Sequence, residues 1–177
     1  LDFLCAQGVT TLYDAGNMTV PDMAYPLISR LDREGRLPLR IEACHHLILP
    51  EQIDSAVAEL MRLRSTYGGK NLKFNSIKVH FDGLHTNNTG ALMKPYTNNP
   101  GARGATLFSE DRMKEFILEL NREKIDLHVH CWGDRSAHVM LNAYERAKHE
   151  IGDQLYTRLT LCHLPLMKDD DFPRFKQ

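Results

Sequence analysis

Five short runs of β-type sequence alternate with helical stretches, and this alternation limits the possible fold more than any other feature. β-branched and aromatic residues predict strands at residues 8–14, 39–44, about 73–81, 125–131 and 158–163. Helical spacing predicts helices at residues 21–36, 50–67, 109–123 and 134–150, with a last helix from Lys168. Strict alternation predicts a parallel sheet with outer helices. Five such strands can form a doubly wound sheet or part of a TIM (β/α)8 barrel.

One long segment interrupts this alternation. Residues 83–105 are rich in Asn, Gly, Thr and Pro, and uninterrupted loops of this length are usually functional or disordered. We expect a loop insertion near the functional site. The chain begins at Leu1 in what resembles the last turns of a helix, and it stops at Gln177 shortly after a helix is predicted to start. These features predict that residues 1–177 form a single fragment of a larger barrel.

Composition and charge narrow the function classes. Hydrophobic residues make up 42% and charged residues 25% of the chain, which is ordinary for a globular protein. The net charge is −1 with dispersed basic residues, so we expect no nucleic-acid partner. No apolar run is long enough to cross a bilayer, so no membrane partner is expected. The four cysteines form no CxxC pair or disulfide pattern, which favours a reduced, cytoplasmic setting.

Three side chains at predicted strand ends suggest a metal centre: Lys78, His130 and His163. Neighbouring strands lie about 4.8 Å apart, and zinc–nitrogen bonds are about 2.0–2.1 Å, so two imidazoles on adjacent strand ends can converge on one cation. The alternative is a pair of hydrogen-bonded histidines that cap a core. Lys78 is either a ligand or a lysine that faces outward with its amine in water.

Several motifs occur in an order that resembles a known family. They are GVTTLYD at residues 8–14, IKVHFDG at residues 77–83, residues 92–96, HVHCWGDR at residues 128–135, and Cys162-His163. Together they resemble the amidohydrolase superfamily, specifically the family 3 or YtcJ-like branch. That branch includes N-substituted formamide deformylases and proteins called exoenzyme regulatory proteins. The resemblance covers nearly the whole chain.

The resemblance implies a (β/α)8 barrel with a metal centre at its C-terminal mouth, of which this chain would hold strands two to six. His130 would match the strand-five metal ligand and His163 the strand-six ligand. Lys78 would match the strand-four lysine, which can carry a carboxyl group and bridge two cations. The paired strand-one histidines would lie before Leu1, and the strand-eight catalytic aspartate would lie after Gln177. Cys162 stands where the family usually has glutamate.

Other residues near the strand ends have expected roles. Asp82, Tyr96 and His128 are predicted to bind substrate, although Asp82 can instead shape the turn into the loop and His128 can be a buried polar residue. Four histidines near strand ends could line the mouth of the site: His45, His46, His80 and His85. Ser109 and Asp134 are expected to cap helices. Cys131 and Cys162 are expected to point away from the metal, because side chains alternate along a strand.

These observations predict a fragment of a metal-dependent hydrolase that cleaves a C–N bond of an amide, formamide, cyclic amide or urea-like small molecule. The cofactor would be a divalent metal, zinc by expectation, with one or two ions. We expect the chain alone to be inactive and to form homo-oligomers through its open sheet edges. The alternative is a catalytically inert, amidohydrolase-like regulatory or binding protein. A flavodoxin-like ligand-binding domain fits the alternation but leaves Lys78, His130 and His163 unexplained.

Overall fold

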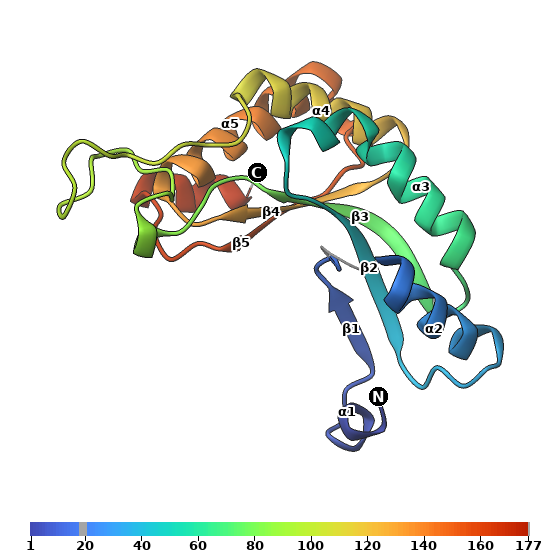
Figure 1. The fold of residues 1–177 in the computed structure, drawn as a ribbon. Coiled ribbons are helices and arrows are strands. Elements are labelled where there is room, and N and C mark those ends of the chain that lie inside the picture. The colour runs from blue at the N-terminus through green and yellow to red at the C-terminus, as the bar shows by residue number, and fades with distance from the viewer. Residues whose placement is uncertain (18–20, 177) are drawn as a thin grey trace. The chain divides into compact units, whose positions relative to one another are not determined.

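The computed structural model describes residues 1–17 and 21–176 (Figure 1). The chain divides into two compact units. The first unit comprises Leu1–Leu47 and Gln52–Lys78, and the second comprises Ile48–Glu51 and Val79–Gln177. Among the described residues, no helix has both the length and the apolar character that crossing a bilayer requires.

The strands follow one another in the sheet in chain order, and this order favours a barrel. They are β1 (Thr11–Asp14), β2 (Arg40–Leu47), β3 (Leu72–His80), β4 (Asp126–Cys131) and β5 (Leu159–His163). β1 pairs with β2 in parallel, and β4 pairs with β5 in parallel. A doubly wound sheet reverses its strand order at a switch point, whereas a (β/α)8 barrel does not. The order therefore supports a partial barrel and argues against a flavodoxin-like sheet.

The first unit contains α1 (Asp2–Ala6), α2 (Pro21–Arg33) and α3 (Ala56–Tyr67) beside its strands. Tyr25 of α2 packs edge-on against Phe74 of β3, with ring centroids 4.9 Å apart. Asp32, near the end of α2, accepts hydrogen bonds from the backbone N–H groups of Asn71 and Leu72. This carboxylate thereby fastens the beginning of β3 to α2, because it accepts from the N–H groups of the residue before β3 and of its first residue.

The second unit is built on α4 (Glu110–Arg122) and α5 (Asp134–Ile151). These helices pack against each other and lie side by side over β4 and β5 (Figure 1). Its core consists of apolar side chains from α4, β4 and α5, including Met113, Phe116, Ile117, Leu120, Leu127, Val129, Met140 and Leu141. The unit also holds 3-10 turns at His85–Asn87, Gly152–Gln154 and Asp169–Lys176.

The predicted helices are present, with differences at their ends. Ser109 caps α4 as predicted, since its side chain accepts a hydrogen bond from Arg112 N. The prediction that Asp134 caps α5 was wrong. Gly133 occupies the cap position, and Asp134 is the first helical residue, with its Oδ1 accepting from Met93 N in the long loop. The stretch Pro50–Ser55 is a 3-10 turn before α3, and the segment after Lys168 is 3-10 rather than α-helical.

A buried carboxylate fastens the C-terminal segment to α5. Asp171 is 1% exposed, and its Oδ1 accepts from Arg174 Nη1 at 2.7 Å and from His138 Nδ1 at 2.9 Å. Arg174 also donates to both oxygens of Glu145, each at 2.7 Å. Burial by itself would raise the pKa of Asp171, but the hydrogen bonds from Arg174 and His138 outweigh it and lower that pKa overall.

We expect Asp171→Asn to lower the free energy of unfolding at pH 7 by about 1.5–3 kcal/mol, because it removes hydrogen bonds to a charged acceptor. The pKa of Asp171 is lower in the folded state than its ordinary value of 3.8, so its stabilisation is present above that value and is lost as the pH falls further. Urea denaturation at pH 7 and below pH 4 should show the difference between the two proteins shrinking in acid. Asp170→Asn, at an exposed neighbour, is the control and should change little.

Candidate functional site

Three histidines meet at the carboxyl ends of consecutive strands within the second unit. His80 ends β3, His130 lies in β4 and His163 ends β5. The rings of His80 and His130 are stacked with centroids 4.2 Å apart. The ring of His163 meets that of His130 edge-on at 4.6 Å. The predicted pair His130 and His163 is therefore brought together, and His80 joins it from the neighbouring strand.

His163 reaches this cluster because the backbone leaves the strand conformation at that residue. In the β4–β5 register, His130 pairs with Cys162 and Cys131 pairs with His163. Regular alternation would therefore place His130 and His163 on opposite faces of the sheet. His163 has φ +75° and Leu164 has φ +47°, a left-handed conformation that non-glycine residues seldom adopt. This turn at the end of β5 brings the imidazole of His163 to His130.

The same register corrects the prediction for one cysteine. Cys162 lies opposite His130, so both side chains are on one face of the sheet. The prediction that Cys162 points away from the site was wrong, because it assumed that His163 keeps the regular alternation. Cys131 is fully buried, and it occupies the position next to His130 on the other face of β4, as predicted.

The environment of His130 keeps its imidazole neutral. The residue is 5% exposed, and burial lowers its pKa to about 4, although the carbonyl of Gly83 opposes this shift. Its Nε2 lies 3.3 Å from Gly83 O and 3.7 Å from Asp82 Oδ1. A neutral imidazole is the form that binds metal ions, since a protonated ring has no free nitrogen lone pair. An N–H on Nε2 donating to Gly83 O would leave Nδ1 as the nitrogen with a lone pair.

Two further aromatic rings extend the histidine cluster. Trp132 stacks near His130 with centroids 5.9 Å apart and lies 5.3 Å from the ring of His163. His85 stacks on Trp132 at 5.4 Å, and its Nδ1 accepts a hydrogen bond from Trp132 Nε1. The sequence predicts that His80 and His85 could line the mouth, without a role in the metal centre. His80 lies two residues after Lys78 at the end of the same strand, and this spacing was the signal that could have ranked it higher.

Asp82 is the most highly connected residue around the cluster. Its carboxylate accepts from the backbone N–H groups of Ala91, Trp132 and Gly133, each at 2.9 Å. Its side chain is completely buried. Asp82 therefore fastens both the long loop and the turn after β4 to the end of β3.

The turn after β4 holds the loop through three more contacts. Asp134 accepts from Met93 N at 2.9 Å. Arg135 donates its backbone N–H to Ala91 O at 3.0 Å and a side-chain N–H to Gly104 O at 2.6 Å. The two most specific sequence motifs, IKVHFDG and HVHCWGDR, are thus physically joined across the loop. Apart from a 3-10 turn and one isolated bridge between Tyr96 and Asn99, the loop has no regular structure, but it is extensively hydrogen-bonded.

The remaining predicted site residues take the following places. Lys78 lies in β3, is 5% exposed and belongs to the first unit. It precedes His80 by two residues, so both side chains are on the same face of β3. His128 is half-buried on the same face of β4 as His130. Tyr96 is buried within the loop, where its hydroxyl donates to Gly90 O at 2.8 Å. The predictions that Tyr96 and His128 bind substrate stay predictions.

The imidazole groups of the cluster are of a type that binds metal ions, but too few side chains are placed around one point to complete a site. Within residues 1–17 and 21–176, no three His, Cys, Asp or Glu side chains are placed to hold one ion. The nearly parallel stack of His80 on His130, with 15° between the rings, does not direct nitrogens from both to one point. His130 and His163 are neighbouring imidazoles of the kind zinc prefers. A complete site would therefore need a further ligand that is not a His, Cys, Asp or Glu of the described residues, such as a modified lysine.

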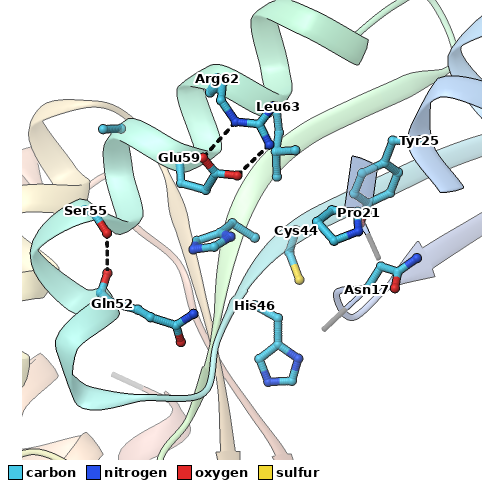
Figure 2. Close-up of a pocket in the computed structure, with 12 residues that line it drawn as sticks. Asn17, Pro21, Tyr25, Cys44, His46, Gln52, Ser55, Glu59, Arg62 and Leu63 are labelled. Carbon is cyan, nitrogen blue, oxygen red and sulfur yellow. Dashed lines mark hydrogen bonds and ion pairs between the residues drawn. The ribbon is translucent and has the colours of Figure 1, made fainter. Parts of the chain in front are cut away.

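Each unit has a cavity near the carboxyl end of a strand among its described residues. The cavity in the first unit measures about 520 Å³ and is lined by residues of α2, β2 and α3, including His45 and His46 (Figure 2). Glu59 and Arg62 face each other on one wall through two hydrogen bonds of 2.7 and 2.8 Å. One of the cavities in the second unit, at the end of β3, measures about 460 Å³ and is lined partly by His80 and Asp82.

We expect Gly133→Ala to disturb the contact between the loop and β4. An added Cβ would lie 2.0 Å from Ala91 O, so the backbone would have to shift at a cost of about 1–3 kcal/mol. Chemical denaturation should record this loss, and hydrogen exchange at Arg135 N, which donates to Ala91 O, should become faster. Gly101→Ala is the matched control, since its nearest neighbour would be 3.7 Å away. Equal stability of both variants would contradict the prediction.

Comparisons with known proteins agree with the motifs and the strand order. The chain is 26% identical over 148 residues to the exoenzymes regulatory protein AepA of Pectobacterium carotovorum, covering 84% of this chain and 31% of that protein. It is 20% identical over 157 residues to the protein LONG AFTER FAR-RED 3 of Arabidopsis thaliana, covering 86% of this chain and 27% of that protein. The chain thus spans about a third of the length of these relatives.

Two solved structures have the same fold over 99% of this chain. One is described as an uncharacterized metal-dependent hydrolase from Pyrococcus furiosus, with 28% identity, a TM-score of 0.71 and 34% of its own length covered. The other, from Pyrococcus horikoshii, has 23% identity, a TM-score of 0.70 and 33% covered, and shows the fold alone. The predicted partial (β/α)8 barrel is confirmed. Residues 2–177 match the amidohydrolase family, and the chain belongs to that family.

Proposed function

We propose that this chain supplies the central strands of a metal-dependent hydrolase that cleaves a C–N bond in an amide, formamide, cyclic amide or urea-like substrate. The observation that carries the proposal is the meeting of His130 and His163 at neighbouring strand ends in a family of hydrolases. Carboxyl ends of parallel strands are where barrels of this type place their active sites. The metal-dependent hydrolase from Pyrococcus furiosus, which shares the fold, supports the same class of chemistry.

The proposed ligands are His130, His163 and a carboxylated Lys78. A divalent metal, which we propose is zinc, supplies a bound water of lowered pKa and polarises the substrate carbonyl. The low pKa of His130 keeps its imidazole neutral and able to ligate. Carboxylation would convert the buried amine of Lys78 into an anionic oxygen ligand and remove the cost of burying an ammonium group. One or two ions are compatible with this set.

The other predicted residues would act on the substrate. Tyr96 lies in the loop and His128 on the face of β4 that carries His130, so both are proposed substrate contacts. The oxygens of Asp82 accept three backbone hydrogen bonds, so we propose that Asp82 affects substrate binding by holding the loop and Trp132 in place. The proposed binding partner is a small-molecule substrate, and we propose that the chain binds neither nucleic acid nor a membrane.

The setting and assembly are also proposals. Cys5, Cys44, Cys131 and Cys162 carry thiols rather than disulfide bonds, which is consistent with a cytoplasmic, reducing compartment. β1 and β5 are the outer strands of the sheet, and outer strands present unpaired backbone groups that can bind another chain. We propose homo-oligomer formation through these edges.

A second candidate function is a catalytically inert, amidohydrolase-like regulatory or binding protein. Two observations favour it: the described part of the chain lacks a three-residue His, Cys, Asp or Glu metal group, and one relative is named a regulatory protein. Cys162 in place of the expected glutamate is a further difference from the enzymes. Metal binding distinguishes the two candidates, because an inert barrel does not need to retain its ligands.

We expect the purified chain to bind zinc and His130→Ala/His163→Ala to lose it, because two imidazole ligands are removed. Elemental analysis after dialysis against zinc-containing and then zinc-free buffer measures the stoichiometry. His149→Ala, at an exposed position near the end of α5, is the control and should keep the metal. Zinc retained by the double variant would contradict the proposed ligands. No zinc in any variant would mean either an incomplete site or an inert barrel, and a metal and activity assay of the full-length protein would separate the two.

We also expect Lys78 to accept carbon dioxide. Chain incubated with zinc and ¹³C-bicarbonate at mildly alkaline pH should show a carbamate carbon resonance that Lys78→Gln abolishes. Lys73→Gln, at an exposed position on the same strand, should leave that resonance intact. A resonance lost equally in both variants, or absent from the unmodified chain, would argue against a carboxylated ligand.

A further inference from the structure

We propose that the cavity of about 460 Å³ in the second unit binds an uncharged, apolar side group of the substrate and thereby sets specificity. This inference rests on the proposed function. The cavity lies between the end of β3 and the two arms of the long loop, one arm containing Thr89 and the other Gly104–Leu107. Its volume falls within the range of about 300–1,000 Å³ that is usual for small-molecule sites.

The cavity adjoins the histidine cluster. His80 lines it, and the ring of His80 stacks on that of His130 at 4.2 Å. A group that fills the cavity therefore lies next to the proposed reaction centre. Such a group is part of the substrate that does not react, and its binding can position the bond that does.

The lining offers no accessible counter-ion for a charged group. Of the residues that line the cavity, only His80 and Asp82 can carry charge, and both oxygens of Asp82 already accept hydrogen bonds from backbone N–H groups. Ile48, Phe81 and Leu107 contribute apolar surface. A carboxylate in this cavity would lose its hydration beside the negative charge of Asp82, and an ammonium group could not reach the oxygens of that buried side chain, so burying either group is costly. The chemistry of the wall therefore selects uncharged, apolar groups.

The cavity is formed before any ligand arrives, because hydrogen bonds hold the loop arms. Leu107 N donates to Phe81 O at 2.7 Å, and Leu92 N donates to Arg103 O at 2.8 Å. Gly104, with φ +61°, lies so close to the other arm that a Cβ there would be 2.0 Å from Gly90 O. Because the site is already ordered, binding does not have to include the free-energy cost of ordering the loop.

Binding is tested with three probes that share one scaffold: N-benzylacetamide, 4-(acetamidomethyl)benzoate and 4-(acetamidomethyl)benzylamine. Amide shifts of the ¹⁵N-labelled, metal-free chain are followed during titration at pH 7.5. We expect the neutral probe to shift Thr89, Gly104 and Leu107, and to bind at least about tenfold more tightly than either charged probe. Equal binding of the charged probes, or shifts confined to other regions, would overturn the inference.

Two variants at Ala105 test whether this cavity is the site. Ala105 lines the cavity and is exposed, so larger side chains are tolerated there. Ala105→Phe should fill the cavity and weaken the neutral probe at least about tenfold. Ala105→Lys should instead strengthen the benzoate probe, a gain that misfolding cannot produce. Asn98→Phe, exposed in the same loop but outside the cavity, is the control, and a loss there equal to that in Ala105→Phe would overturn the inference.

The titration is done without metal, so its result tests the cavity independently of whether the chain binds zinc. Selective binding of the neutral probe by a chain that never binds zinc would support the cavity and give no support to the proposed metal ligands. Zinc binding through His130 and His163 without selective probe binding would contradict the cavity and leave the hydrolase.

Discussion

The buried carboxylate of Asp82 is the contact on which the arrangement of the site depends. Its two oxygens satisfy three backbone N–H groups, one from the long loop and two from the turn after β4. A buried N–H without an acceptor costs about 1–3 kcal/mol, so three such donors on one carboxylate fix the geometry of both segments. Gly133 completes the contact, because only a residue without Cβ can lie this close to Ala91. The positions of the long loop and of the turn that follows His130 therefore depend on this contact.

The histidine cluster combines a buried ring, that of His130, with the half-buried ring of His80 and the exposed ring of His163. His80, His130 and His163 come from three consecutive strand ends and remain within ring contact. Burial keeps His130 neutral, which suits both a metal ligand and a hydrogen-bonded core residue. The family membership and the nearby cavity favour the ligand role, whereas the lack of a third His, Cys, Asp or Glu in position among the described residues leaves room for an inert barrel.

The strands, their order of appearance and most helix positions could be predicted from local patterns. The predicted strand at residues 125–131 became β4 at Asp126–Cys131, and Ser109 caps α4 because a cap depends on residues only three apart. Asp134 was assigned to the cap by the same local rule, and the rule failed. A distant donor, Met93 N, attracts its carboxylate, and no pattern within the helix contains that information.

The sequence by itself determined the parallel α/β architecture and the candidates Lys78, His130 and His163, because periodicity and strand-end position are local properties. Only the tertiary structure decided the face on which His163 lies, since the left-handed turn at the end of β5 overrides alternation, and only the β4–β5 register places Cys162 opposite His130. It likewise decided that Asp82 holds backbone groups from two segments. Those donors lie nine to fifty-one residues away along the chain, and only packing brings them to one carboxylate.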